Sequence, residues 1–194
     1  RTVYFAPVVT TLVAVAVMLA ALIATGLWLG TRKANRTVVV EAKAIPYVES
    51  SDALERGRYL YATRGCVDCH GAAGAGREFA SDGKGLRIVG PNISAAGVTR
   101  GYREVDWVRT LRHGVRPDGR PLRVMPSEDY ARLTDADLAA LIAHVRKLPP
   151  VQGQAEAVVE FPLPARVAFG LGLIPDTIER MAASGARLLL YSVN

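Results

Sequence analysis

The chain has 194 residues, a formal net charge of +6 at neutral pH and only two cysteines. Two cysteines are too few for the disulfide framework of a small secreted domain, and a closed structural zinc site needs four ligands, usually two such pairs. The length allows one domain of about 100 residues with segments on either side.

An uncharged run dominated by Val, Leu, Ala and Ile covers residues 7–30. The run is long enough to cross a hydrocarbon core of about 30 Å as a helix. A cleaved signal peptide would have an apolar region of about 7–15 residues and a small-residue cleavage site soon after it, and neither fits this segment. We therefore predict an uncleaved transmembrane anchor over residues 1–30.

The rest of the chain divides into a linker over residues 31–50, a domain over 51–150 and a C-terminal extension over 151–194. Helical signals occur throughout the domain. A first helix is expected with Asp52 as its cap, and Gly57 within it would allow another helix to approach closely.

Two further helices are expected in the same domain. One covers residues 104–113 and ends at Gly114, and the other begins at the capping residue Thr134 and carries one apolar face. The last helix is the expected partner of Gly57. Three short helices joined by long loops have little core of their own, so we expect a large apolar cofactor to supply one.

Both cysteines lie in the stretch Cys-Val-Asp-Cys-His, which is the pattern of c-type haem attachment. The thiols of Cys66 and Cys69 can each add to a vinyl group of the porphyrin, and His70 is then held next to the iron. A redox-active pair of the thioredoxin kind normally follows a strand, whereas Cys66 follows an expected helix. A haem-free thiol oxidoreductase is nevertheless an alternative function.

Four matches give the chain a resemblance to a membrane-anchored bacterial class I cytochrome c. They are the Gly57 and Tyr61 pair of the first helix, the haem-attachment stretch, Gly-Pro-Asn at 90–92, and Met-Pro at 125–126 ahead of the last helix. The resemblance covers residues 51–150. It implies an all-α fold around one covalently attached haem c, with His70 and Met125 as the two axial ligands.

Other site residues follow from the same resemblance or from their charge. The carbonyl of Pro91 is the expected acceptor for the second ring nitrogen of His70, and Asn92 could brace that loop. Trp107, by resemblance, is a candidate donor to the haem propionates, which must be hydrogen-bonded when partly buried. Candidate donors by charge and position are Arg112, Arg116 and Arg123.

Met125 is the only methionine inside the domain, because Met18 lies in the anchor and Met181 in the extension. A thioether favours ferrous iron and raises the reduction potential relative to a second imidazole. His113 is the next candidate for the sixth ligand. If neither residue bound the iron, the open position would indicate a haem-based sensor of small ligands.

The predicted function is electron transfer by a single-haem carrier that is not itself an enzyme. Basic residues are frequent between 77 and 123, and they would attract acidic redox proteins. We expect partner subunits of a larger membrane complex, with no small-molecule substrate and no nucleic acid.

The expected location is the bacterial cytoplasmic membrane, with the haem domain on the periplasmic side, where the resemblance implies that haem is attached. The charges conflict with this orientation. Arg32, Lys33 and Arg36 follow the apolar run, a distribution that ordinarily places the C-terminal side in the cytoplasm.

The extension is rich in apolar residues and proline and is not needed by a minimal cytochrome c. We expect it to dock on a partner subunit or at the membrane interface, because a free tail would expose an apolar patch. Deleting residues 151–194 should then release the domain from its complex without changing its spectrum.

Overall fold

The computed structural model describes residues 5–185 and 190–192. The chain separates into two compact units. The smaller unit comprises the chain up to residue 35 together with Leu163–Pro175, and the larger unit comprises Arg36–Pro162 with the residues from Asp176 onward.

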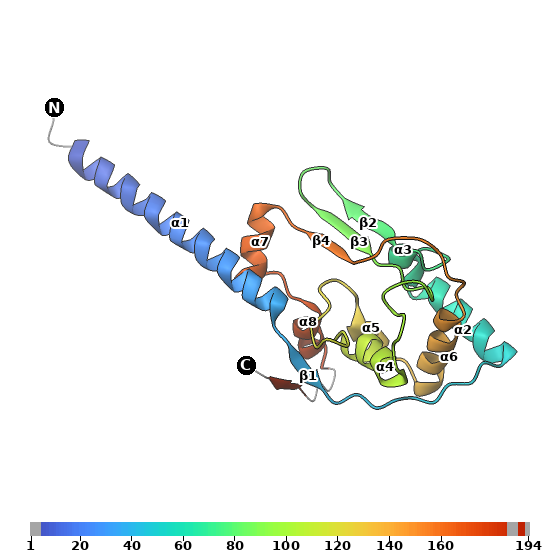
Figure 1. Ribbon diagram of the computed structural model, residues 1–194. Coiled ribbons are helices and arrows are strands. Elements are labelled where there is room, and N and C mark those ends of the chain that lie inside the picture. The colour runs from blue at the N-terminus through green and yellow to red at the C-terminus, as the bar shows by residue number, and fades with distance from the viewer. Residues whose placement is uncertain (1–4, 186–189, 193–194) are drawn as a thin grey trace. The chain divides into compact units, whose positions relative to one another are not determined.

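The smaller unit consists of α1 (Phe5–Asn35) and α7 (Leu163–Gly170), which lie against each other (Figure 1). Pro7–Asn35 is long and apolar enough to cross a membrane, and it continues past residue 30, the expected end of the anchor. The two helices approach closely because they meet at glycines: a Cβ added to Gly170 would lie 1.8 Å from the carbonyl oxygen of Gly26. Lys33 donates from Nζ to the carbonyl of Ile174 at 3.0 Å, just beyond α7.

The larger unit is mostly helical, as the resemblance implies, with two small antiparallel sheets. Its helices are α2 (Ser51–Thr63), α3 (Cys66–His70), α4 (Glu104–His113), α5 (Ser127–Tyr130), α6 (Asp135–Arg146) and α8 (Thr177–Ala183). One sheet pairs β1 (Val38–Val40) with β5 (Leu190–Ser192). The other has the order β2 (Arg77–Ser81), β3 (Arg87–Gly90), β4 (Val158–Glu160).

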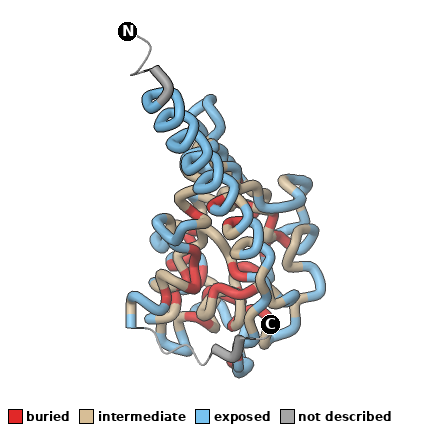
Figure 2. Tube along the Cα trace, turned by 90° about the vertical axis from the view of Figure 1, so that its left-hand side faces the viewer, coloured by how far each residue is buried: buried red, intermediate tan, exposed pale blue. Residues whose placement is uncertain are grey.

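The main core of this unit forms where α2 crosses α6 (Figure 1). A Cβ added to Gly57 would lie only 2.0 Å from the carbonyl oxygen of Ala140, so the expected close approach of the last helix is confirmed. Leu60, Leu138 and Leu141 are buried around the crossing. Figure 2 shows that buried residues are frequent in the larger unit, whereas most of α1 is exposed.

The ends of the helices follow local chemistry. Thr134 caps α6 by accepting from the backbone N–H of Asp137 at 3.1 Å, and Gly114 ends α4 with φ at 67°, both as expected. The expected cap of α2 is wrong: Ser50, not Asp52, accepts from the backbone N–H of Ala53. Asp52 instead lies in the first turn, where a carboxylate complements the helix dipole.

Much of the described extension folds back onto this chain. Val158–Glu160 is a run containing two β-branched residues and adds a third strand to the hairpin of β2 and β3. Further on, α8 packs against α5. The cap of α8, Asp176, is almost fully buried and pairs with Arg36 at 2.8 Å.

Candidate haem site

The two cysteines lie on a single short helix, α3, between Gly65 and Gly71, which both have positive φ angles. Neither cysteine forms a disulfide, and Cys66 is buried while Cys69 is half-buried. Burial raises the pKa of the Cys66 thiol to about 11, so this sulfur is a protonated thiol at neutral pH. Two unbridged thiols on one turn are the arrangement that two thioether links require.

The imidazole of His70 is held from one side. Its Nδ1 lies 2.9 Å from the carbonyl oxygen of Pro91, the contact implied by the resemblance. Since a carbonyl can only accept, Nδ1 carries the proton and Nε2 presents a lone pair. Burial lowers the pKa of His70, and the hydrogen bond to Pro91 opposes this only in part, so the ring is neutral, the form that binds a metal.

The loop that supplies the Pro91 carbonyl is fixed on both sides. Before it, Gly90 packs so tightly that an added Cβ would lie 2.0 Å from the carbonyl oxygen of Cys69. After it, Asn92 donates from Nδ2 to the carbonyl of Val151 at 2.7 Å and accepts at Oδ1 from the N–H of Ser94. Asn92 therefore braces the loop through both ends of its amide.

Met125 lies in the loop between α4 and α5, and its half-buried side chain packs against the main core cluster. Its carbonyl oxygen accepts from the N–H of Ser127, from the hydroxyl of Thr177 and from the guanidinium of Arg180. The backbone at the candidate sixth ligand is thus held by two side chains of α8.

Trp107 contributes a further feature that suits a haem. Its side chain is 5% exposed, and its ring Nε1–H is buried with no acceptor among the residues that the structure describes. A buried donor without a partner is costly, and a propionate oxygen would satisfy it. The thiols, the neutral imidazole, the thioether and this donor together fit haem c.

The family model for cytochrome c matches residues 54–149. These residues form a cytochrome c domain. The resemblance inferred from the motifs is therefore confirmed.

Similar proteins are cytochrome subunits of larger assemblies. The chain is 30% identical over 137 residues to the fructose dehydrogenase cytochrome subunit of Gluconobacter japonicus, covering 66% of this chain and 28% of that protein. It is 31% identical over 130 residues to the cytochrome c subunit of a quinone alcohol dehydrogenase of Gluconobacter oxydans, covering 61% and 26%. It is 25% identical over 118 residues to the cbb3-type cytochrome c oxidase subunit CcoP of Helicobacter pylori, covering 59% and 35%. The chain thus spans about a third or less of the length of these relatives.

The candidate propionate donors of the cytochrome c domain differ in the hydrogen bonds and ion pairs that they make within the chain. Arg112 donates to Asp135 at 2.7 Å and to the carbonyl of Leu133 at 2.9 Å, so its charge is paired. Arg116 is likewise paired, with Asp118. Arg123 donates to the carbonyl of Val159 at 3.3 Å, and burial lowers its pKa. Of these three cations, Arg123 is the one without a carboxylate partner among the residues that the structure describes.

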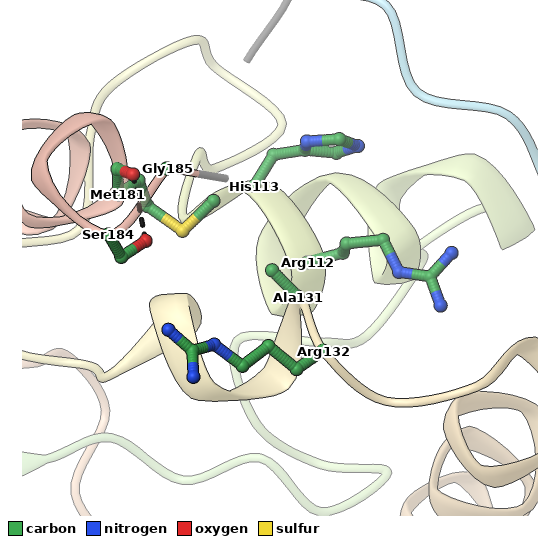
Figure 3. Close-up of a pocket in the computed structure, with 7 residues that line it drawn as sticks. All are labelled: Arg112, His113, Ala131, Arg132, Met181, Ser184 and Gly185. Carbon is green, nitrogen blue, oxygen red and sulfur yellow. Dashed lines mark hydrogen bonds between the residues drawn. The ribbon is translucent and has the colours of Figure 1, made fainter. Parts of the chain in front are cut away.

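His113 is the last residue of α4. It lines a cavity of about 370 Å³ together with Arg112, Arg132 and Met181. Figure 3 shows the imidazole of His113 and the guanidinium of Arg112 pointing away from Met181. Burial lowers the pKa of His113, and the neighbouring arginines lower it further. His113 is therefore neutral, and its buried Nδ1 has no hydrogen-bond partner among the residues that the structure describes.

Three residues near the site make contacts that the motifs do not predict. Tyr61 donates from its hydroxyl to the carbonyl of Gly71 at 2.7 Å, which ties α2 to the end of α3. Thr177 and Arg180 contact the loop of Met125 from the extension. The spacing of Asp176 and Glu179, a capping box, could have located the start of their helix, but no local pattern indicates what that helix contacts.

Proposed function

We propose that this chain is a membrane-anchored cytochrome c with one haem c, and that it carries single electrons between redox proteins without transforming a substrate itself. The observation that carries the proposal is the geometry of His70. Its Nδ1 is engaged by Pro91 while its Nε2 is left to bind a metal, one residue after a pair of unbridged thiols. The chain has no third cysteine, which supports a single haem.

The residues of the chain have separate tasks in this function. Cys66 and Cys69 would hold the porphyrin through thioether bonds, and Pro91 fixes the tautomer and ring orientation of His70. Met125 would supply a soft thioether ligand, which favours the reduced state and so raises the potential. Bound haem c supplies an iron that gains and loses one electron without leaving its ligands.

The partners that we propose are subunits of a larger membrane complex. The relatives are cytochrome subunits of dehydrogenases and of an oxidase, and α1 is long and apolar enough to anchor this chain beside such a complex. An excess of basic residues, +6 over the whole chain, favours an acidic docking surface on the partner. We place the haem domain on the periplasmic side of a bacterial cytoplasmic membrane.

Replacing Met125 by Ala tests the proposal. The purified wild-type chain should retain haem through acid-acetone extraction, show the far-red sulfur-to-iron absorption band when oxidised, and resist carbon monoxide when reduced. The Met125→Ala variant should lose the band, bind carbon monoxide readily and have a lower reduction potential, because the thioether ligand is gone.

Met18→Ala is the matched control, since Met18 is an exposed methionine of α1 outside the domain. It should leave all three properties unchanged. A wild-type protein that binds carbon monoxide at once would favour the sensor function instead, and a protein that holds no haem would favour the thiol oxidoreductase.

A further inference from the structure

We propose that α8 clamps the loop of the sixth ligand, with Arg180 and Thr177 as positioning residues for Met125. This inference rests on the proposed function, in which Met125 binds the iron. The family match ends at residue 149, so the clamp comes from a segment outside the cytochrome c domain.

Four consecutive backbone carbonyls of the loop accept hydrogen bonds from α8. The N–H of Thr177 donates to Leu122 at 3.2 Å. The guanidinium of Arg180 donates to Arg123 at 3.3 Å, to Val124 at 3.2 Å and to Met125 at 2.8 Å. The hydroxyl of Thr177 adds a second contact to the Met125 carbonyl at 3.0 Å.

The guanidinium is itself fixed in place. Its Nε donates to Glu128 at 2.7 Å, and its Nη2 also donates to the hydroxyl of Thr177 at 2.9 Å. Glu128 belongs to α5, which begins two residues after Met125. Arg180 and Glu128 are both largely shielded, with side chains 26% and 19% exposed, so water competes little for this network.

The N-terminus of α8 is also held by several interactions. Asp176 and Glu179 form a reciprocal capping box, and Asp176 pairs with Arg36 at 2.8 Å. Thr177 is fully buried against Gly114, where an added Cβ would lie 2.3 Å from the Thr177 methyl group. The helix that holds the loop is therefore a rigid support.

The first part of the loop is ordered by its own hydrogen bonds, such as that from the N–H of Leu122 to the carbonyl of Gly114 at 2.8 Å, whereas the carbonyls that follow are held by α8. Residues 114–126 contain two glycines and three prolines, and an isolated bridge between Val115 and Pro121 is the only strand-like pairing that the structure describes there. Backbone carbonyls that are partly shielded from water need donors, and α8 supplies them to Leu122–Met125. A neutral thioether is a weak ligand, so it stays on the iron only where the backbone that carries it cannot move away.

This inference revises the expectation that the extension can be deleted without spectral change. Removing α8 would leave the carbonyls from Leu122 to Met125 without these donors. The sixth ligand would then dissociate more readily, even though the haem would remain attached through Cys66 and Cys69.

The test is the Arg180→Met variant of the full-length holoprotein, in which an unbranched apolar side chain replaces the guanidinium and its donors. Carbon monoxide binding to the reduced protein should rise at least about tenfold, because losing one charge-assisted hydrogen bond commonly shifts an equilibrium by that factor or more. The far-red sulfur-to-iron band should also disappear at a lower denaturant concentration than the helical circular dichroism signal. Arg166→Met, an exposed arginine of α7, is the matched control and should behave as wild type.

Thr177→Val is the second variant, because it keeps the buried volume while removing the hydroxyl that contacts Met125. It should shift the same readouts in the same direction by less, with unchanged circular dichroism. Wild-type carbon monoxide resistance and band stability in both folded variants would overturn the clamp. If the wild-type protein itself lacks the band, the proposed function fails first, and the two failures are thereby distinguished.

Discussion

Asp106 accepts several hydrogen bonds that no motif in the sequence predicts. Its carboxylate is 5% exposed and accepts from the backbone N–H of Arg103 at 3.1 Å, from the guanidinium of Arg103, and from Arg109. The hydrogen bonds from Arg103 lower the pKa of Asp106, against the opposing effect of burial. This carboxylate fixes the first turn of α4, next to Trp107.

Replacing Asp106 by Asn should therefore lower stability in a pH-dependent way. A carboxylate with a lowered folded-state pKa contributes stability above its unfolded pKa of about 3.9, and that contribution is lost as pH falls through the folded value. We expect Asp106→Asn to cost about 1–2 kcal/mol between pH 5 and 7, and to differ little from wild type near pH 2. Denaturant unfolding followed by circular dichroism at several pH values measures this.

Glu41→Gln, at an exposed position of the linker, is a suitable control for the general effect of removing one negative charge. Its difference from wild type should be small at every pH. A difference between Asp106→Asn and wild type that is equally large at pH 2 and pH 7 would show that the carboxylate charge does not matter.

Among the elements, the crossing of α2 and α6 depends most on one position. Gly57→Ala would place a methyl group 2.0 Å from the carbonyl oxygen of Ala140, which is rigid backbone. The helices must move apart, and overpacking of this kind costs about 1–3 kcal/mol. Thermal unfolding should show a lower midpoint for Gly57→Ala.

An increase in the stability of Gly57→Ala, the opposite of the expected result, would also be informative. An alanine in an unhindered helix is more stable than glycine by about 1 kcal/mol. A Gly57→Ala variant that is stabilised would therefore mean that the two helices are not in close contact at this point.

At the scale of the whole molecule, charged residues in the last turns of α1 and just after it have partners in the folded chain. Lys33 contacts the carbonyls of Phe169 and Ile174, and Arg36 pairs with Asp176. These residues have structural uses that account for their presence after the span. The distribution of charge is thus compatible with a haem domain outside the cytoplasm.

That orientation can be measured directly. Protease added to intact spheroplasts should digest the haem domain and leave a membrane-bound fragment containing α1, since the bilayer does not shield a periplasmic domain. Inside-out vesicles, treated in the same way, should protect it. Protection in spheroplasts and digestion in inside-out vesicles would reverse the proposed location.

The parts of the molecule that could be predicted are those with local signals. The motifs of the cytochrome c domain, the cap at Thr134 and the stop at Gly114 each depend on residues within one turn of each other. The pairing of Val158–Glu160 with β3 and the contacts of Arg180 with Met125 join segments far apart in the chain. Such contacts depend on tertiary packing, and nothing in the composition of the extension indicates its partner.

The antiparallel pairing of β1 with β5 has a consequence for biogenesis. Val40 pairs with Leu190. Strand β1, which is synthesised directly after the anchor, can therefore pair only after β5, which follows the whole haem domain, has been synthesised. Contacts between such distant segments form slowly. Cys66, Cys69 and His70 leave the ribosome well before α8 and β5, so haem attachment can precede closure of the loop that carries Met125. Maturation would then pass through a stage in which His70 is in place as a ligand and the loop that carries Met125 is not yet held by α8.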